Sequence, residues 1–225
     1  WGALVFGRPP PPPPLWPGVG GGLGLAVLPP RQSLGWAVQG YDPSPAAAAG
    51  RELLGLPIIP DYLGPETLQG VPPFDLILAS EVIEHVPDPH GFLNALAPAI
   101  TPTGWLILTT PSASGVHPAA TPASLLPLLT PGYHLVLFSA TSLTRLLEDH
   151  GFIHHCRRET ATTLTIIASR QPFVANPDAV LDRGLYRAYL QQRLASLDPE
   201  LPLAHGLAGR LFKEQVNAGH YLQAL

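Results

Sequence analysis

The stretch that decides the fold is FDLILASEVIEHVPDPHGFLNALAPAITPTGWLILTTPS, residues 74–112. Its first part, Phe74–Ser80, is almost continuously apolar, which is typical of a strand that is covered on both faces of its sheet. An Asp-Pro pair then predicts the cap and first turn of a helix over His90–Ala99. We expect a turn at Thr103–Gly104 and a second strand over Trp105–Thr109. A strand, a helix and a strand in this order indicate a parallel pair within an α/β sheet.

The same alternation continues on both sides of this stretch. Upstream, the expected elements are a strand over Trp36–Tyr41, a helix over Ala46–Leu54 and a short strand over Pro57–Ile59. Downstream, they are a strand-like run at Leu135–Phe138, a helix over Ser139–His150, and strands at Phe152–Cys156 and Thr162–Ala168. This pattern predicts an α/β fold with a doubly wound, mostly parallel sheet that carries an antiparallel strand at its edge.

Changes in composition divide the chain into three parts. Residues 1–17 contain an unbroken proline run, Pro9–Pro14, which predicts a stiff polyproline II leader or a ligand for a partner with an aromatic groove. Residues 18–170 carry the α/β pattern. Residues 171–225 have apolar residues at three- and four-residue spacing. We interpret this last part as a helical appendage, with helices at Ala179–Ser196 and Leu203–Leu225.

The charge balance and the apolar runs limit the classes of partner. Charged residues make up 12% of the chain and the formal net charge is −4, so a nucleic-acid partner, which needs clustered Lys or Arg, is not expected. No apolar run reaches the roughly 18 residues that span a bilayer, so no membrane partner is expected either. The single cysteine, Cys156, allows no internal disulfide. Together with the lack of a signal-peptide pattern, this predicts a cytoplasmic protein.

Candidate binding residues follow the predicted strands, because open α/β sheets bind ligands beyond the carboxyl ends of their strands. Gly18, Gly20 and Gly22 would let the backbone approach a ligand closely, or would form a flexible linker. Asp42 can accept both hydroxyls of a ribose, or can form a turn. Asp61 follows the short third strand and either contacts an adenine amino group or is a solvated loop residue.

A second group of candidates follows the strand Phe74–Ser80. If this segment is helical, Glu81, Glu84 and His85 lie on one face, where they could bind a divalent metal or perform acid–base chemistry. The alternative is a loop in which Glu81 caps backbone and His85 packs in a polar core. His134 could complete a site with His85, or could be a turn residue.

Three quoted stretches resemble one known family. Residues 74–112 strongly resemble the region from the fourth to the fifth strand of class I S-adenosylmethionine-dependent methyltransferases, in the subgroup that includes the ubiquinone-biosynthesis O-methyltransferases. WAVQGYDPSP (residues 36–45) resembles the second strand and ribose-binding acidic turn of that family. PGYHLVLFSATSLTRLLEDHGF (residues 131–152) resembles its later loop, helix and strand. The resemblance covers most of residues 18–170 and implies a Rossmann-like methyltransferase fold with S-adenosylmethionine as cofactor.

The resemblance also implies a role for each candidate. The residues that would bind the cofactor are Gly18, Gly20 and Gly22 at its amino-acid end, Asp42 at the ribose, Asp61 at the adenine, and Ser80 with Glu81 along the pocket. His85 and Glu84 would be the catalytic pair. In small-RNA 2′-O-methyltransferases an E-x-x-E-H run and a later histidine bind a metal, and Glu81, Glu84, His85 and His134 match that arrangement. The E-H pair is also common in relatives not known to use metal, so a divalent metal is not the expected cofactor.

The first cofactor motif departs from the family pattern. Trp16 stands where the family has an acidic residue, and the strand before the glycines is proline-rich. Because a proline-filled strand lacks ladder donors, we expect Trp1–Phe6 to supply the first strand, or the pocket to be damaged. The predicted function is methyl transfer from S-adenosylmethionine to a small-molecule or carbohydrate-like acceptor. The alternative is a catalytically impaired methyltransferase-like module that binds a partner.

Overall fold

The computed structural model describes residues 15–19, 37–175 and 183–221. The chain divides into two compact units, one within residues 2–178 and one within residues 179–225. The strands of the larger unit are β1 (Leu15–Val19), β2 (Ala37–Tyr41), β3 (Ile58–Ile59), β4 (Phe74–Ser80), β5 (Ile100–Pro111), β6 (His154–Glu159) and β7 (Thr163–Ser169). Its helices are α3 (Pro45–Leu54), α4 (Pro89–Leu96), α5 (Pro122–Leu129) and α6 (Ala140–Asp149), with single 3₁₀ turns at Ile83–His85, Ala97–Ala99 and Ala113–Gly115.

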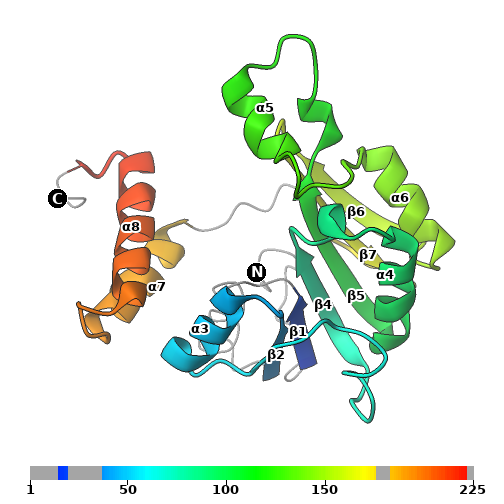
Figure 1. The fold of residues 1–225 in the computed structure, drawn as a ribbon, viewed down its shortest axis with the longest axis horizontal. Helices are drawn as coiled ribbons and strands as arrows, with labels where there is room; N and C mark the ends of the chain where they lie inside the picture. The colour runs from blue at the N-terminus through cyan, green and yellow to red at the C-terminus, as the bar shows by residue number, and fades with distance from the viewer. Residues whose placement is uncertain (1–14, 20–36, 176–182, 222–225) are drawn as a thin grey trace. The chain divides into compact units, whose positions relative to one another are not determined.

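The described strands form one seven-stranded sheet in the order β3-β2-β1-β4-β5-β7-β6 (Figure 1). Strands β1 to β5 pair in parallel, whereas β7 runs antiparallel to both of its neighbours, β5 and β6. The chain adds strands in one direction from β1 to β3 and in the other direction from β4 onward. The predicted doubly wound, mostly parallel sheet with antiparallel pairing at its edge is therefore confirmed.

Local sequence signals explain where the helices begin and end. The side chains of Ser44, Asp88 and Ser139 accept the backbone N–H of the residue three positions later and cap α3, α4 and α6. At α6 the cap is reciprocal, because the Ser142 side chain accepts the Ser139 N–H. Gly151, at a φ of 83°, lies where α6 ends.

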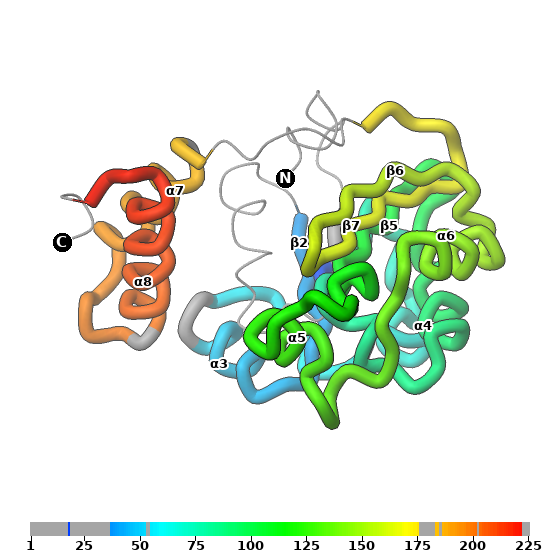
Figure 2. The backbone as a smooth tube through the Cα atoms, turned by 90° about the horizontal axis from the view of Figure 1, so that it is seen from above, coloured from blue at the N-terminus to red at the C-terminus, as the bar shows by residue number. Residues whose placement is uncertain are grey.

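Two apolar layers cover the opposite faces of the sheet, because alternate residues of each strand point to opposite sides. On one face, side chains such as Ile77, Leu108 and Ile166 pack against leucines of α4 and α6. These two helices lie side by side there (Figure 2). On the other face, a smaller cluster contains Val38, Leu76, Leu78, Ile107 and Ile167. The larger layer fixes α4 and α6 against one face of the sheet.

Strand β1 corrects the prediction about the proline-rich segment. It includes Trp16 and Pro17, which the sequence places in the leader, and it lies in the centre of the sheet between β2 and β4. Its whole length pairs with β2, whereas its pairing with β4 involves only Gly18 and Val19, which follow the proline. Pro17 has no N–H to donate, but the strand tolerates this loss because the hydrogen-bond ladder between β1 and β4 begins only after Pro17. Trp1–Phe6, one of the two alternatives that we considered at this point, lies outside the described residues.

Three further boundaries differ from the prediction. The ladder of β5 starts at Ile100 and shifts register before Trp105, so Thr103–Gly104 is an irregularity within the strand and not a turn before it. The run Leu135–Phe138 is not a strand, since only Phe138 makes an isolated bridge, to Ser112. Helix α5 was not predicted, because Pro127 inside it is normally a helix breaker.

The C-terminal unit contains two packed helices, α7 (Arg183–Ala195) and α8 (Pro202–Asn217). Arg183 donates to both carboxylate oxygens of Glu214, at 2.8 Å each. Both helices were predicted, but α8 ends at Asn217, because Gly219 adopts a φ of 75° and the His220 N–H donates back to the carbonyl of Gln215. Among the helices of the described ranges, none has the length and apolar character needed to cross a bilayer.

Candidate functional site

The carboxyl ends of the central strands lie at one level. Val19 of β1 pairs with Tyr41 of β2 and with Ala79 of β4, so the residues that follow, Asp42 and Ser80, flank the end of β1. Neighbouring strands lie about 4.8 Å apart, which places these two residues roughly 10 Å from each other. The strand order also changes direction between β1 and β4, and open α/β sheets bind ligands at such a switch point.

Asp42 is held rigidly at the end of β2. Its side chain is nearly buried, and Oδ1 accepts the backbone N–H of Ser44 at 2.8 Å. Ser44 in turn accepts the N–H of Ala47 at 3.2 Å at the start of α3. The turn-forming role is thus present, and it fixes the carboxylate where a ligand at the switch point would lie. The ribose-binding role stays a prediction.

The other cofactor candidates are less completely described. Gly18 is buried within β1, whereas Gly20 and Gly22 lie outside the described residues. Asp61 is exposed, two residues beyond β3, and its Oδ1 accepts the N–H of Tyr62 at 2.7 Å. It therefore shapes its own loop, and a contact with adenine remains a prediction.

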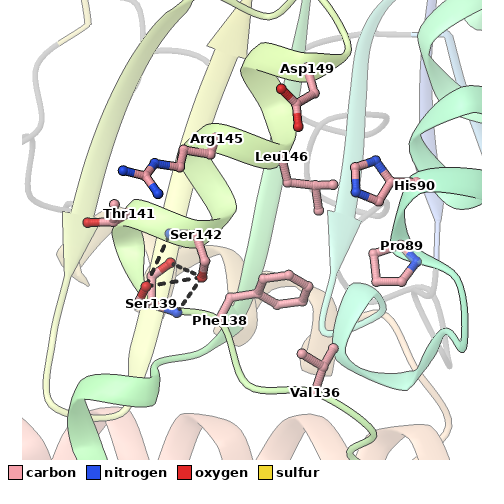
Figure 3. Close-up of a pocket in the computed structure, with 10 residues that line it drawn as sticks. All are labelled: Pro89, His90, Val136, Phe138, Ser139, Thr141, Ser142, Arg145, Leu146 and Asp149. Atoms are coloured by element: carbon pink, nitrogen blue, oxygen red, sulfur yellow. Dashed lines mark hydrogen bonds between the residues drawn. The ribbon is translucent and has the colours of Figure 1, made fainter.

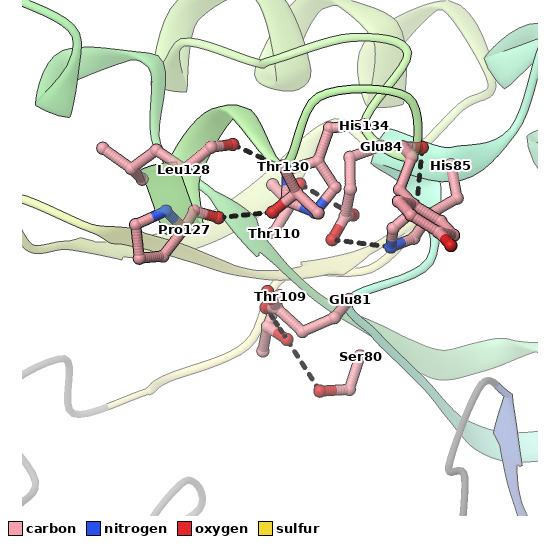
Figure 4. A network of polar contacts seen from close by, with 11 residues as sticks. Ser80, Glu81, Glu84, His85, Thr109, Thr110, Pro127, Leu128, Thr130 and His134 are labelled. Atoms are coloured by element: carbon pink, nitrogen blue, oxygen red, sulfur yellow. Dashed lines mark hydrogen bonds and ion pairs between the residues drawn. The ribbon is translucent and has the colours of Figure 1, made fainter. Parts of the chain in front are cut away.

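Ser80 and Glu81 belong to a short chain of hydrogen bonds at the end of β4 (Figure 4). The Thr109 hydroxyl donates to Oε1 of Glu81 at 2.9 Å. Ser80 Oγ lies 2.8 Å from the same hydroxyl oxygen and is the donor to it, since the Thr109 proton is directed at Glu81. The backbone N–H of Glu81 also donates to the carbonyl of Thr109, at 2.8 Å. These contacts fix both residues against β5.

Of the two alternatives for this segment, the helical one, in which Glu81, Glu84 and His85 share one face, is not observed. Only a 3₁₀ turn over Ile83–His85 forms, and Glu81 lies before it with a φ of 54°. Glu81 binds Thr109 and Glu84 binds Thr110. Because successive residues of a strand point to opposite faces of the sheet, the two carboxylates are held apart.

Glu84 is the buried acid of the site. Its side chain has no exposed surface, and Oε2 accepts the Thr110 hydroxyl at 2.9 Å. Oε1 accepts no hydrogen bond among the described residues and lies 3.7 Å from Nε2 of His85. Burial raises the pKa of Glu84, while the bond from Thr110 acts in the opposite direction. A buried carboxylate with one unbonded oxygen is poised to accept a proton or a cation.

His85 and His134 face this carboxylate from two segments (Figure 4). Nδ1 of His85 lies 3.0 Å from the carbonyl oxygen of Tyr133, and Nδ1 of His134 lies 2.6 Å from that of Leu128. A carbonyl can only accept, so each Nδ1 is the donor and, in the neutral rings, each Nε2 keeps its lone pair. The ring centroids are 4.8 Å apart, edge to face.

The ligand atoms of Glu84, His85 and His134 all lie within 4.8 Å of one another. Imidazoles whose second nitrogen donates to a backbone carbonyl are typical of metal ligands, because that bond fixes the ring orientation. Of the four metal candidates from the sequence, these three come together, and Glu81 is not part of the cluster. Two nitrogens and one carboxylate oxygen suit Zn²⁺ and similar ions better than Mg²⁺.

The chain also has a groove elsewhere, with a volume of about 470 Å³ (Figure 3). Its walls are the start of α4 and the exposed side of α6, and Val136 and Phe138 lie in the loop between His134 and α6. Neither Asp42 nor Glu81 lines it. The groove is therefore separate from the end of β1, where the cofactor candidates lie.

Residues 18–155 match the model of a family described as the methyltransferase domain. The chain belongs to the class I S-adenosylmethionine-dependent methyltransferase family. The match spans β1 to the start of β6 and so includes every candidate residue described above.

Curated relatives of this methyltransferase domain share part of its sequence. A ubiquinone biosynthesis O-methyltransferase of Methylobacterium sp. (strain 4-46) is 37% identical over 101 residues, and one of Caulobacter sp. (strain K31) is 36% identical over 102 residues. Each match covers 41% of this chain and 38% of the relative. The aligned part of the chain thus spans well under half the length of these relatives.

Solved methyltransferase structures share the fold. An O-methyltransferase family protein from Burkholderia thailandensis aligns with a TM-score of 0.54 at 18% identity, over 70% of this chain and 51% of that one. The glycopeptide N-methyltransferase MtfA aligns with a TM-score of 0.52 at 15% identity, over 72% of this chain and 85% of that one. At these identities the likeness concerns the fold alone.

Sequence reasoning missed Thr109 and Thr110, the residues of this methyltransferase domain that hold both carboxylates. The only signal was a pair of threonines at the end of an apolar strand, in LILTT. Polar residues at that position lie where parallel strands end, and this could have marked them as site residues.

Proposed function

We propose that this chain is an S-adenosylmethionine-dependent methyltransferase that transfers a methyl group to an oxygen of a small-molecule or carbohydrate-like acceptor. The observation that carries the proposal is the alignment of Asp42 and Ser80 on either side of the end of β1, within a chain segment that matches the methyltransferase domain. The names of the curated relatives, which are O-methyltransferases, support oxygen as the attacked atom.

The cofactor would span the ends of β2, β1 and β4. In this proposal the buried carboxylate of Asp42 accepts the ribose hydroxyls, and Asp61 reaches the adenine amino group. Ser80 and Glu81 line the opposite side, where their bonds to Thr109 keep them in place. The glycine-rich residues after Val19 would lie next to the amino-acid end of the cofactor.

When bound, the cofactor supplies an electrophilic methyl group on a sulfonium. Methyl transfer would form an O–C bond to the acceptor, and the electron pair of the broken carbon–sulfur bond would go to sulfur. The acceptor must also lose its hydroxyl proton. His85 Nε2 or Glu84 Oε1 can take it, and burial already raises the pKa of Glu84 in the direction that suits a base.

A divalent ion at Glu84, His85 and His134 is a second form of the proposal, in which Glu84 Oε1 and His85 Nε2 are ligands and the ion acts in place of the base. The support is the approach of one unbonded carboxylate oxygen and two imidazole rings that are oriented by backbone carbonyls. Such an ion would supply Lewis-acid polarisation of an acceptor hydroxyl. Removal of metal by a chelator should then abolish methyl transfer while leaving cofactor affinity unchanged, and added Zn²⁺ or Mn²⁺ should restore it. Full activity after chelation would exclude this form alone.

Calorimetry with S-adenosylmethionine and with S-adenosylhomocysteine tests the main proposal. We expect micromolar binding of both, followed by release of S-adenosylhomocysteine when small phenols and sugars are offered as acceptors. Absence of binding to either compound at millimolar concentration would contradict an enzyme and would favour the alternative of a methyltransferase-like binding module.

A further inference from the structure

A second pair of histidines links α4 to the end of α6, and one of the two, His90, lines the groove. His90 is near the start of α4, and His150 is the residue that ends α6. Nδ1 of His90 lies 3.2 Å from Nε2 of His150, and the ring centroids are 5.3 Å apart with the planes inclined by 44°. The two residues are 60 positions apart in the sequence, so only the packing of the two helices brings them together.

This separation is close to the one that two ligands of a single ion require. A tetrahedral zinc ion holds imidazole nitrogens at about 2.0–2.1 Å, which places two such nitrogens about 3.3–3.4 Å apart. The observed 3.2 Å differs by only a few tenths of an ångström. Loss of the proton between the rings and a rotation of both would therefore direct the two nitrogens at one ion.

An acidic group lies next to the pair. The carboxylate of Asp149 faces the groove that His90 also lines (Figure 3). The other charged group on the groove is Arg145, one turn earlier on α6. The two rings thus lie beside a carboxylate, whose negative charge favours a cation.

We propose that His90 and His150 bind a borderline transition-metal ion such as Zn²⁺, which joins α4 to α6 at a site distinct from the Glu84–His85–His134 cluster. Water completes the coordination on the open side of the groove. Binding displaces the proton shared between the two rings and involves no other covalent change. The ion would tie the helix that follows the 3₁₀ turn of Glu84 and His85 to the helix that follows His134.

The test uses a host variant, His85→Ala/His134→Ala, in which the cluster has lost both imidazoles. Zn²⁺ titrated into this host by calorimetry should bind at one equivalent and raise the Tm by several degrees at saturation. Adding either His90→Ala or His150→Ala should weaken binding by at least about tenfold and remove most of the rise in Tm. His155→Ala is the matched control, because His155 pairs with Glu148 of α6 at 3.1 Å and lies outside the site.

Several results would contradict the proposal that His90 and His150 bind Zn²⁺. These are no Zn²⁺ binding to the host, binding that is unchanged by His90→Ala, or an equal loss in the His155→Ala control. If the host does not fold, His90→Gln in the otherwise unchanged chain tests the same Zn²⁺ site. The stoichiometry of Zn²⁺ should then fall by one equivalent, and an unchanged stoichiometry would exclude the pair as a site.

Discussion

The hydroxyl of Thr110 donates to Oε2 of Glu84 at 2.9 Å, inside the protein and away from water. This single bond decides which carboxylate oxygen is available. With Oε2 occupied, Oε1 is the oxygen that faces the imidazoles of His85 and His134. A residue of β5 thereby orients an acid that follows β4, and the register between these two strands becomes part of the site.

Replacement of Glu84 by glutamine should stabilise the protein at neutral pH in the presence of chelator, by on the order of 1 kcal/mol. The reason is that burial raises the folded-state pKa of Glu84 above its unfolded value, so the ionised form at neutral pH costs stability. As the pH falls, the wild-type protein takes up the proton and regains this stability. The difference should therefore vanish below about pH 4, where the unfolded glutamate is protonated as well. Urea unfolding at several pH values measures it, and a Glu84→Gln variant that is less stable at pH 7 would contradict the assignment.

Thr110→Val should destabilise the protein by about 1–3 kcal/mol at neutral pH, because it leaves a buried carboxylate without its donor. Valine has nearly the same shape as threonine, so little packing is lost. Thr109→Val is the matched control, since Thr109 donates to Glu81, which is exposed and can bind water instead. In chemical denaturation, the loss in the free energy of unfolding should be larger for Thr110→Val than for Thr109→Val by more than the error of the method. Equal losses would indicate that the burial of Glu84 does not matter.

Most of the sheet could be predicted from the sequence, because its strands are either almost continuously apolar or bounded by strong turn signals. β4 was predicted at its observed limits, and α6 was marked by Ser139 and Gly151 at its two ends. The first strand could not be predicted, because proline is normally excluded from the centre of a sheet. The sequence does not show that the hydrogen bonds between β1 and β4 begin only after Pro17.

The candidate site could be predicted only in its residue types. Glu84, His85 and His134 were identified, but the positive φ of Glu81, which removes it from the cluster, has no sequence signal in a glutamate. The pairing of Thr110 with Glu84 depends on the register between β4 and β5, and the contact of His90 with His150 depends on how α4 packs beside α6. Both are tertiary relationships between segments far apart in the chain.

Gly115→Ala should destabilise the protein by about 1–3 kcal/mol through steric overlap. A Cβ atom at this buried position would press on the carbonyl oxygen of Ala161 and lie 2.5 Å from Cδ1 of Leu128 in α5. Gly64→Ala serves as the control, because nothing lies within 4 Å of a Cβ atom there. Thermal unfolding should show a lower Tm for the first variant and a change within about 0.5 kcal/mol for the second. Equal Tm values would show that α5 moves away without cost.

Asp42→Ala should weaken the affinity for S-adenosylmethionine by about ten- to a hundredfold, which corresponds to the loss of hydrogen bonds to a charged group. It should also lower the Tm slightly, because the N–H of Ser44 loses its acceptor. Asp42→Asn separates the two effects, since its amide oxygen can still accept from Ser44 while the negative charge is gone. We therefore expect weaker cofactor binding in both variants and a lower Tm only in the alanine variant, measured by calorimetry and thermal unfolding. If both variants bind the cofactor as tightly as the wild type, Asp42 serves the turn at the start of α3 and does not hold the ribose.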